Sequence, residues 1–475
     1  LIQTVKLRLF LLLLHWFHPY LLTTSSNSFP SFPLARERMK SQYVTNICLL
    51  ILCLGAANNT PWPLLIFLAS LLPLLHHTCR VPGGSAWRGV PAAPGPAGWP
   101  LLGCIPFMGP LAHRRLAELA ASHGASRLMA LTVGATRVVI SSHPDTAREI
   151  LCGSAFADRP PKEAARLLMF ERAIGFSPSG EYWRHLRRVA TGNLFCPRRI
   201  AAQEGLRQRV AGDMVRRVGY EMERKGSVEL RGVLERGSLE SMVGSLFGES
   251  SLGREREEEL VGMVKEGYDL IGTFNWEDYF PMGGLLDFHG VGRRCKTLAE
   301  KVRSLVGEVI AERRRGGLHS HVGLGEDFLT ALLTLPKEES LCDSDIVAVL
   351  WEMIFRGTDV VAILLEWIMA RMALHPGVQA KAQQELSACL GGAQRAVRDS
   401  DIPKLPYLQA VVKEVLRLHP PGPLLSWARL AVRDVHVGKS LVPAGTTAMV
   451  NMWAITHDGS VWADPWAFRP ERFLE

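Results

Sequence analysis

The chain has 475 residues, of which 47% are hydrophobic and 21% charged, and its formal net charge is +8. These values are near those of ordinary globular proteins, so they exclude wholesale disorder and a polytopic membrane protein. No basic segment is interleaved with stacking aromatic residues, so the sequence contains no recognisable nucleic-acid-binding module. The nine cysteines are scattered without a C-x-x-C pair. This argues against a disulfide framework or a structural zinc site and fits a reducing compartment.

The N-terminal region begins with two segments of different character. The first methionine is Met39, so residues 1–38 are either translated upstream sequence, which we favour, or a genuine extension. After Met39, the apolar stretches 47–55 and 62–75 are separated by a short polar break. Neither stretch alone reaches the roughly 20 residues that span a bilayer as a helix, but together they do.

A cleaved signal peptide is the alternative interpretation of this apolar region, because its apolar core has a similar length. Against it, the following residues 79–82, Cys-Arg-Val-Pro, lack a convincing small-residue cleavage site. We therefore predict that residues 39–80 form an uncleaved N-terminal membrane anchor.

Residues 81–103 are rich in proline and glycine. Proline fixes φ and disfavours helix at the preceding residue, so residues 90–100 cannot be helical. We predict a semi-rigid hinge between the anchor and a globular body that begins at residue 104.

The body, residues 104–475, shows mainly helical periodicity. From Leu111 onward, apolar residues recur at spacings of three and four, whereas strand-like alternation is confined to short segments such as 130–141 and 430–448. We predict a mainly α fold with small β-sheets. G-x-G-x-x-G, P-loop and G-x-S-x-G motifs are absent, so nucleotide and acyl-hydrolase chemistry have no support.

Trp183 and Arg187 lie one helical turn apart in the segment 181–188. Without context, this W-x-x-x-R spacing is equally typical of an amphipathic helix with a basic face. An indole N–H and a guanidinium are also the fixed donors that a carboxylate needs.

The longest apolar helical pattern runs from Asp343 to Met372. Asp343-Ser344-Asp345 offers a capping start and the following His-Pro a stop, which gives a helix about 45 Å long. Its interior contains the segment 355–360, Phe-Arg-Gly-Thr-Asp-Val. A helical glycine costs about 1 kcal/mol and a buried aspartate costs more unless it is paired, so this segment is a candidate functional site.

Glu414 and Arg417 lie at i,i+3 in a helical segment that two prolines end. Alone, such a pair is a weak signal, because it contributes only tenths of a kcal/mol on an exposed helix. The order of the motifs along the chain strengthens this signal, since Pro-Glu-Arg-Phe follows at residues 470–473 and supplies Arg472.

In this order the motifs resemble those of the cytochromes P450, which are haem-thiolate monooxygenases. The resemblance covers nearly everything from residue 91 to residue 475: hinge, W-x-x-x-R, Gly-x-Asp, E-x-x-R and P-E-R-F. Phe-Arg-Gly-Thr-Asp and the segment 442–455 look like the plant growth-regulating, KLUH-type microsomal subfamily. The resemblance implies the cytochrome P450 fold.

The resemblance implies a role for each motif. Trp183, Arg187 and Arg429 are expected to bind the propionates of haem b, iron protoporphyrin IX. Gly357 would be the close-approach glycine over the haem, and Asp359 the acid of the proton-delivery path.

The E-x-x-R and P-E-R-F motifs would form a buried lock behind the haem. There, Glu414 would bind Arg417 and Arg472 together. Two arginines sharing one carboxylate make charge-assisted, fork-like hydrogen bonds, so we expect removal of either partner to cost several kcal/mol.

One departure from the family pattern falls on the catalytic segment. The usual threonine position is Val360, and valine keeps the shape but loses the hydrogen-bond donor and acceptor. Thr358 points about 160° away on the helix and is a poor substitute. We therefore expect weaker coupling of electron use to product formation.

The resemblance also implies a cysteine thiolate on the haem iron, in a loop after P-E-R-F. The last cysteine of the sequence is Cys389, and we interpret His457 as a loop residue and not as a replacement axial ligand. We therefore interpret the sequence as C-terminally truncated before the cysteine loop, with no metal ligand of its own, and expect the chain as written to be inactive.

The function that the resemblance implies is that of a monooxygenase in the endoplasmic reticulum membrane, with its catalytic domain facing the cytosol. Electrons from NADPH, delivered by NADPH–cytochrome P450 reductase, would activate O₂ and insert one oxygen atom into an apolar, fatty-acid-like substrate. The alternative is a catalytically dead product of a degraded gene copy, or a membrane-anchored interaction protein without catalysis. Val360 and the missing loop favour the alternative, whereas the intact lock motifs favour the enzyme.

Overall fold

The computed structural model describes residues 83–99, 102–248, 252–275, 278–280, 287, 290–316, 327–391, 395–424 and 428–474, all of which belong to the unit Cys79–Glu475. The predicted extension 1–38 and the predicted anchor 39–80 lie outside the described residues. Within the described ranges, no helix combines the length and apolar character that crossing a membrane requires.

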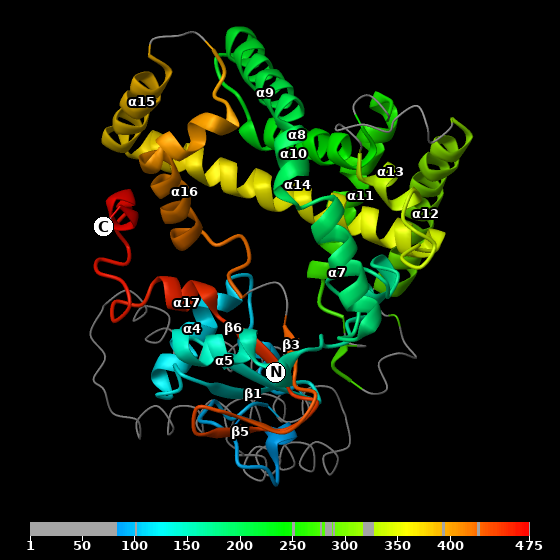
Figure 1. Cartoon of the computed structure of the whole chain (residues 1–475). Helices are drawn as coiled ribbons and strands as arrows, with labels where there is room; N and C mark the ends of the chain where they lie inside the picture. The colour runs from blue at the N-terminus through cyan, green and yellow to red at the C-terminus, as the bar shows by residue number, and fades with distance from the viewer. Residues whose placement is uncertain are drawn as a thin grey trace, which may run out of the picture. The chain divides into compact units, whose positions relative to one another are not determined.

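Helices make up most of the described chain, which confirms the predicted fold class (Figure 1). The α-helices are α4 (Ala112–Ser122), α5 (Pro144–Cys152), α6 (Glu163–Leu168), α7 (Glu181–Asn193), α8 (Pro197–Ala202), α9 (Glu204–Lys225), α10 (Leu230–Phe247), α11 (Arg254–Gly272), α12 (Val291–Arg315), α13 (Phe328–Leu333), α14 (Asp343–Leu374), α15 (Pro376–Leu390), α16 (Pro406–Leu418) and α17 (Met452–Thr456). Short 3₁₀ helices are η2 (Ser85–Trp87), η3 (Ile105–Phe107), η4 (Ser154–Phe156), η8 (Asp399–Lys404) and η9 (Pro470–Phe473).

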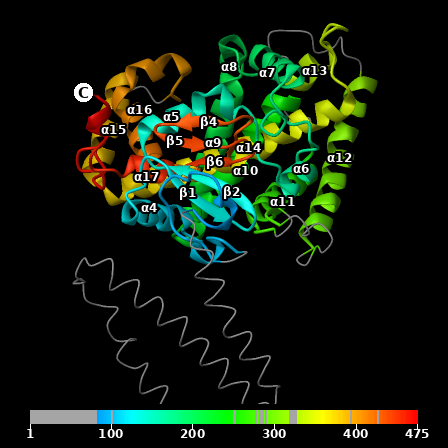
Figure 2. The ribbon, with the colours of Figure 1, turned by 90° about the horizontal axis from the view of Figure 1, so that it is seen from below.

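The strands form two small sheets, as the short alternating segments predicted. They are β1 (Met129–Val133), β2 (Thr136–Ser141), β3 (Arg429–Leu430), β4 (Val435–Val437), β5 (Ser440–Val442) and β6 (Thr447–Val450). One sheet has the order β1-β2-β6-β3, with β2 and β6 parallel, and β4 pairs with β5 in the other. β1 and β2 form a hairpin whose two-residue loop starts at Gly134, with φ at +60°, a conformation that favours glycine. Figure 2 shows the strands of both sheets in projection, beside α4, α5 and α17.

The described part of the predicted hinge packs against β1. The buried Trp87 donates its indole N–H to the Leu131 carbonyl oxygen at 3.0 Å, and the Ala130 amide donates to the Pro94 carbonyl oxygen at 3.1 Å. A Cβ added to Gly95 would overlap the Ala130 carbonyl oxygen. Residues 83–99 therefore differ from a free spacer, because small residues let their backbone approach the sheet closely.

The central helix is α14, which crosses the helical part of the unit (Figure 1). Its side chains Trp351 and Ile354 are fully buried in the largest apolar cluster. The helix spans the predicted range, but its N-cap is Cys342, with no side-chain cap hydrogen bond. Asp343, which the sequence predicted as part of a capping start, instead accepts a hydrogen bond from Arg314 at 2.6 Å and complements the helix dipole from the first turn.

We expect Gly95→Ala to lower the free energy of unfolding by about 1–3 kcal/mol, because the added methyl group meets backbone that cannot rotate away. The matched control is Gly109→Ala, where an added Cβ meets nothing within 4 Å. Denaturant unfolding measures both. Equal stability of the two variants would contradict the close packing of this segment on β1.

Candidate active site

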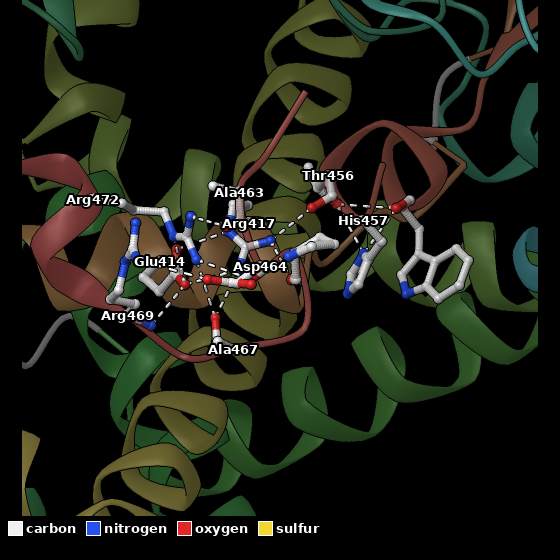
Figure 3. Close-up of polar contacts among 11 residues, drawn as sticks. Glu414, Arg417, Thr456, His457, Ala463, Asp464, Ala467, Arg469 and Arg472 are labelled. Atoms are coloured by element: carbon white, nitrogen blue, oxygen red, sulfur yellow. Dashed lines mark hydrogen bonds and ion pairs between the residues drawn. The ribbon is translucent and has the colours of Figure 1, made fainter. Parts of the chain in front are cut away.

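The lock predicted from the sequence has formed around Glu414 (Figure 3). The Glu414 side chain is 0% exposed, and the Arg417 and Arg472 side chains are 2% and 5% exposed. Arg417 donates from Nε and Nη2 to the two carboxylate oxygens at 2.8 Å each, and Arg472 Nε donates to Oε1 at 3.1 Å. The structure thus brings all three residues together in the fork-like geometry of strong ion pairs.

The same two arginines hold the irregular segment 456–472 against α16. Arg417 Nη1 donates to the carbonyl oxygens of Thr456 at 2.7 Å and Pro465 at 2.8 Å. Arg472 Nη1 donates to the Ala463 carbonyl oxygen at 2.8 Å (Figure 3). Backbone carbonyls outside helices and sheets need such partners when they are buried, so the lock supplies hydrogen bonds that secondary structure does not.

Four arginines from separate elements gather near the sheet. Arg187 is on α7, Arg356 on α14 and Arg429 on β3, while Arg159 precedes α6. Burial, and then the charges of Arg429, Arg356 and Arg187, lower the pKa of Arg159 to about 10, with Asp158 acting in the opposite direction. Buried like charges destabilise a fold unless an anion compensates them.

Two members of this arginine cluster, Arg187 and Arg429, were predicted as propionate partners. The guanidinium of Arg187 lies 5.0 Å from the ring centre of Trp183, at the exposed end of the cluster. Burial and Arg187 lower the pKa of Arg429, and its buried Nε has no hydrogen-bond partner among the described residues. A buried donor without a partner, beside other cations, fits the carboxylates of a haem.

The sequence reasoning missed Arg159 as a site residue. The residue lies in an irregular segment, where no periodic pattern marks its direction. Its neighbour Asp158 accepts a backbone hydrogen bond from Leu430 at 2.8 Å, which places the segment beside β3 and Arg429. The sequence indicates an irregular segment here through the two prolines that follow Arg159.

An apolar cavity of about 370 Å³ adjoins the arginine cluster. Its lining is mainly apolar and includes Met108, Leu116, Val138, Phe176, Leu424 and Met449. Arg159 and Lys162 add positive charge and Asp278 adds a carboxylate. Because Arg159 belongs to both the cavity and the cluster, an apolar ligand in the cavity would lie next to the cationic site.

On α14, the predicted catalytic residues face different neighbours. A Cβ added to Gly357 would overlap Met242 of α10, so this glycine permits close packing of α10 on α14. The hydroxyl of the buried Thr358 donates to the Ile354 carbonyl oxygen at 2.7 Å and is used within its own helix. Val360 is 39% exposed. Burial raises the pKa of Asp359, and the charge of Arg231 opposes that rise.

A second carboxyl group that the sequence reasoning missed is Glu352. It is 2% exposed, and its Oε1 accepts the backbone N–H of Gly175 at 2.8 Å. Burial raises its pKa, and its Oε2 has no hydrogen-bond partner among the described residues. The sequence signal that could have indicated Glu352 is its position four residues before Arg356 on the same helix.

Two described cysteines, Cys104 and Cys295, are buried. Burial raises the pKa of Cys104 and of Cys295 to about 11, so both stay neutral thiols near neutral pH. His457 follows α17, with Nδ1 2.9 Å from the Trp453 carbonyl oxygen, and stacks on Trp453. In the described part of the chain, no three His, Cys, Asp or Glu residues gather as metal ligands would.

Comparisons with known proteins place this site in a family. The Cytochrome P450 family model matches residues 93–475. Cytochrome P450 78A5 of Arabidopsis thaliana is 51% identical over 404 residues, which cover 83% of this chain and 77% of that protein. Cytochrome P450 78A3 of Glycine max is 49% identical over 427 residues, which cover 88% and 80%.

The fold agrees with these sequence comparisons. A zebra fish cytochrome P450, solved with progesterone, superposes with a TM-score of 0.64 at 25% identity, over 76% of this chain and 83% of that one. The chain therefore belongs to the cytochrome P450 family of haem monooxygenases. The resemblance to a plant subfamily of cytochromes P450 is confirmed by the 78A relatives.

We expect Glu414→Ala to lower the free energy of unfolding by about 3–5 kcal/mol, because it leaves two buried guanidinium groups without their carboxylate. Lys413→Ala is the matched control, since Lys413 is the exposed neighbour on the same helix and should change stability by less than about 0.5 kcal/mol. Denaturant unfolding monitored by circular dichroism measures both. A Glu414 variant as stable as the control would refute the lock.

Proposed function

We propose that this protein is a haem-dependent monooxygenase that inserts one atom of O₂ into an apolar substrate. The observation that carries the proposal is the arginine cluster beside the apolar cavity. Cationic donors for two carboxylates and an apolar chamber for a substrate are the two things that such an enzyme needs next to each other. The proposed electron source is NADPH, through a partner reductase. The proposed location is the endoplasmic reticulum membrane, with the catalytic domain facing the cytosol.

The residues present fit haem b at its propionate side. Trp183, Arg187 and Arg429 would hold the propionates. The Nε of Arg429, which has no hydrogen-bond partner among the described residues, is one donor suited to them. When bound, haem supplies the iron at which O₂ is activated. The family resemblance assigns the iron ligand to a cysteine loop after P-E-R-F.

An apolar, fatty-acid-like substrate suits the cavity. Each methylene group that leaves water for such a lining contributes about 0.8 kcal/mol to binding. The aliphatic side chains of Leu116, Val138 and Met449 would bury the chain, and Arg159 provides a positive charge at the lining. These residues bind and orient the substrate and exclude water, and Asp359, whose pKa burial raises, is the proposed acid of the proton-delivery path.

Haem titration of the apoprotein tests the proposal. We expect Arg429→Gln to weaken haem binding by roughly tenfold to a hundredfold, because one charge-assisted hydrogen bond to a propionate is lost. Arg433→Gln is the control, since Arg433 is exposed and, within the described part of the chain, donates a hydrogen bond to the Ser154 hydroxyl at 3.0 Å.

Two results would contradict the proposal. The first is equal haem affinity of the Arg429 and Arg433 variants. The second, in a version of the chain completed through the cysteine loop, is a reduced carbon monoxide complex whose spectrum lacks the signature of a thiolate-bound haem, which would favour a protein without monooxygenase chemistry.

Val360→Thr restores the hydroxyl that the family pattern carries. In a haem-loaded version of the chain completed through the cysteine loop, we expect the fraction of electrons lost as peroxide to fall by roughly twofold or more, since a hydroxyl can hold and pass a proton. The control is Val361→Thr, which adds the same group about 100° around the helix. Peroxide released per NADPH oxidised is the measurement, and an unchanged leak would refute the role of this position.

A further inference from the structure

The loop between α9 and α10 presents a serine to solvent. Helix α9 ends at Lys225, and Gly226 follows in the left-handed region, with φ at +69°. Residues 226–229 are irregular, and Ser227 is exposed. Arg224 and Lys225 are exposed as well and come three and two residues before Ser227. An exposed, irregular segment of this kind is accessible to a modifying enzyme.

The two basic residues before the serine indicate a class of enzyme. Protein kinases choose their substrates partly by charge pattern, and one class prefers Arg or Lys three and two residues before the serine. The same residues also suit a helix end, because positive charge stabilises the last turn of a helix. The sequence pattern alone is therefore not specific, and the surroundings of Ser227 decide between the two readings.

Ser227 belongs to the lining of a cavity of about 830 Å³ between α9, α10 and α11. Among the described residues, the lining contains six cationic side chains: Arg217, Lys225, Arg231, Arg236, Arg254 and Lys265. The carboxylates of the same described lining are Glu221, Glu229 and Glu235. Positive charge therefore exceeds negative charge around the serine.

Two contacts of these cations favour an added anion. Arg217 donates from Nη2 to Glu240 at 2.6 Å, but its buried Nη1 has no hydrogen-bond partner among the described residues. Arg236 and Arg254 share a single oxygen, Oε1 of Glu258, at 3.5 Å and 3.4 Å. An anion in the cavity would give the Arg217 donor a partner and would offset the excess of positive charge.

We propose that Ser227 is a phosphorylation site and that its phosphate group binds the cationic side chains of this cavity. In the modification, Ser227 Oγ forms a bond to the γ-phosphorus of ATP held by a serine kinase that selects basic sequences. The bond from that phosphorus to the oxygen it shares with the β-phosphorus breaks, ADP leaves, and the hydroxyl proton passes to a base of the kinase. The product carries up to about two negative charges and three strong acceptor oxygens at neutral pH.

A phosphate in this cavity would connect three helices. Arg217 belongs to α9, Arg231 to α10 and Lys265 to α11. Arg231 also makes an ion pair with Glu366 of α14, so the cavity adjoins a contact between α10 and the central helix. The site goes beyond the proposed monooxygenase function, since the described linings of this cavity and of the 370 Å³ cavity share no residue.

The first test is a kinase reaction on the folded chain, with Mg²⁺, ATP and cyclic-AMP-dependent protein kinase, a member of the basic-selective class. Mass spectrometry should find phosphate on Ser227, and Arg224→Gln should slow its incorporation by about tenfold. The control is Arg216→Gln, since Arg216 is exposed on the same helix but lies outside the two recognition positions. A chain without phosphate on Ser227, or equal rates for the two variants, would overturn the modification site.

The second test is a ³¹P magnetic-resonance titration of the phosphorylated protein. The second pKa of the phosphoserine should be lower in the folded protein than in urea, because nearby cations favour the doubly charged phosphate. Lys265→Gln should reduce this difference by about half, since it removes a cation of the lining, whereas Lys301→Gln changes an exposed lysine of α12 and should leave it unchanged.

A phosphoserine pKa that is equal in the folded and unfolded protein, or that responds equally to the two lysine variants, would overturn the binding of the phosphate in the cavity. Neither test involves haem. Failure of the proposed monooxygenase function would therefore leave both results standing, and failure of either test would leave the proposed function untouched.

Discussion

The carboxylate of Glu414 is fully buried and accepts hydrogen bonds from two arginines and from the backbone N–H of Arg469. Neither the carboxylate nor the guanidinium groups could stay buried without the others, since an unpaired charge in the interior costs several kcal/mol. The remaining N–H groups of the two arginines donate hydrogen bonds to backbone carbonyl oxygens of the segment 456–472. One set of charges therefore fixes a segment that has little regular structure and ties it to α16.

Other buried charges are less completely compensated, and they mark the functional region. The arginine cluster near β3 contains cations that lower one another's pKa. On α14, Glu352 keeps an oxygen without a partner among the described residues, and Asp359 has a raised pKa. Both oxygens of the Glu414 carboxylate accept hydrogen bonds, whereas Glu352 Oε2 and Arg429 Nε have no partner among the described residues and suit the binding of a ligand or a proton.

The sequence predicted the regular parts of this fold well, for physical reasons. Helix α14 has a strong apolar pattern and a His-Pro stop, and α16 ends at consecutive prolines, so local signals define both. The contact of Glu414 with Arg472 spans 58 residues and could not follow from periodicity. It was expected only because the order of motifs resembled a family.

The parts that the sequence did not predict depend on tertiary contacts. Arg159 lies in an irregular segment whose direction is set by its pairing with β3. The packing of Gly95 on β1 and of Gly357 on Met242 likewise depends on which backbones approach each other. The roles of Gly357, Asp359 and Val360 in catalysis, and the boundaries at residues 38 and 80, stay predictions.

The most direct test of the lock is a double-mutant cycle on Glu414 and Arg472, with the free energy of unfolding as the measured quantity. Glu414→Gln, Arg472→Gln and the double variant separate the pairwise interaction from the separate costs of each change. The structure predicts a coupling energy of about 2–3 kcal/mol for this buried, charge-assisted pair. Additive effects of the two changes would contradict the claim that this pair holds the segment 456–472 to α16.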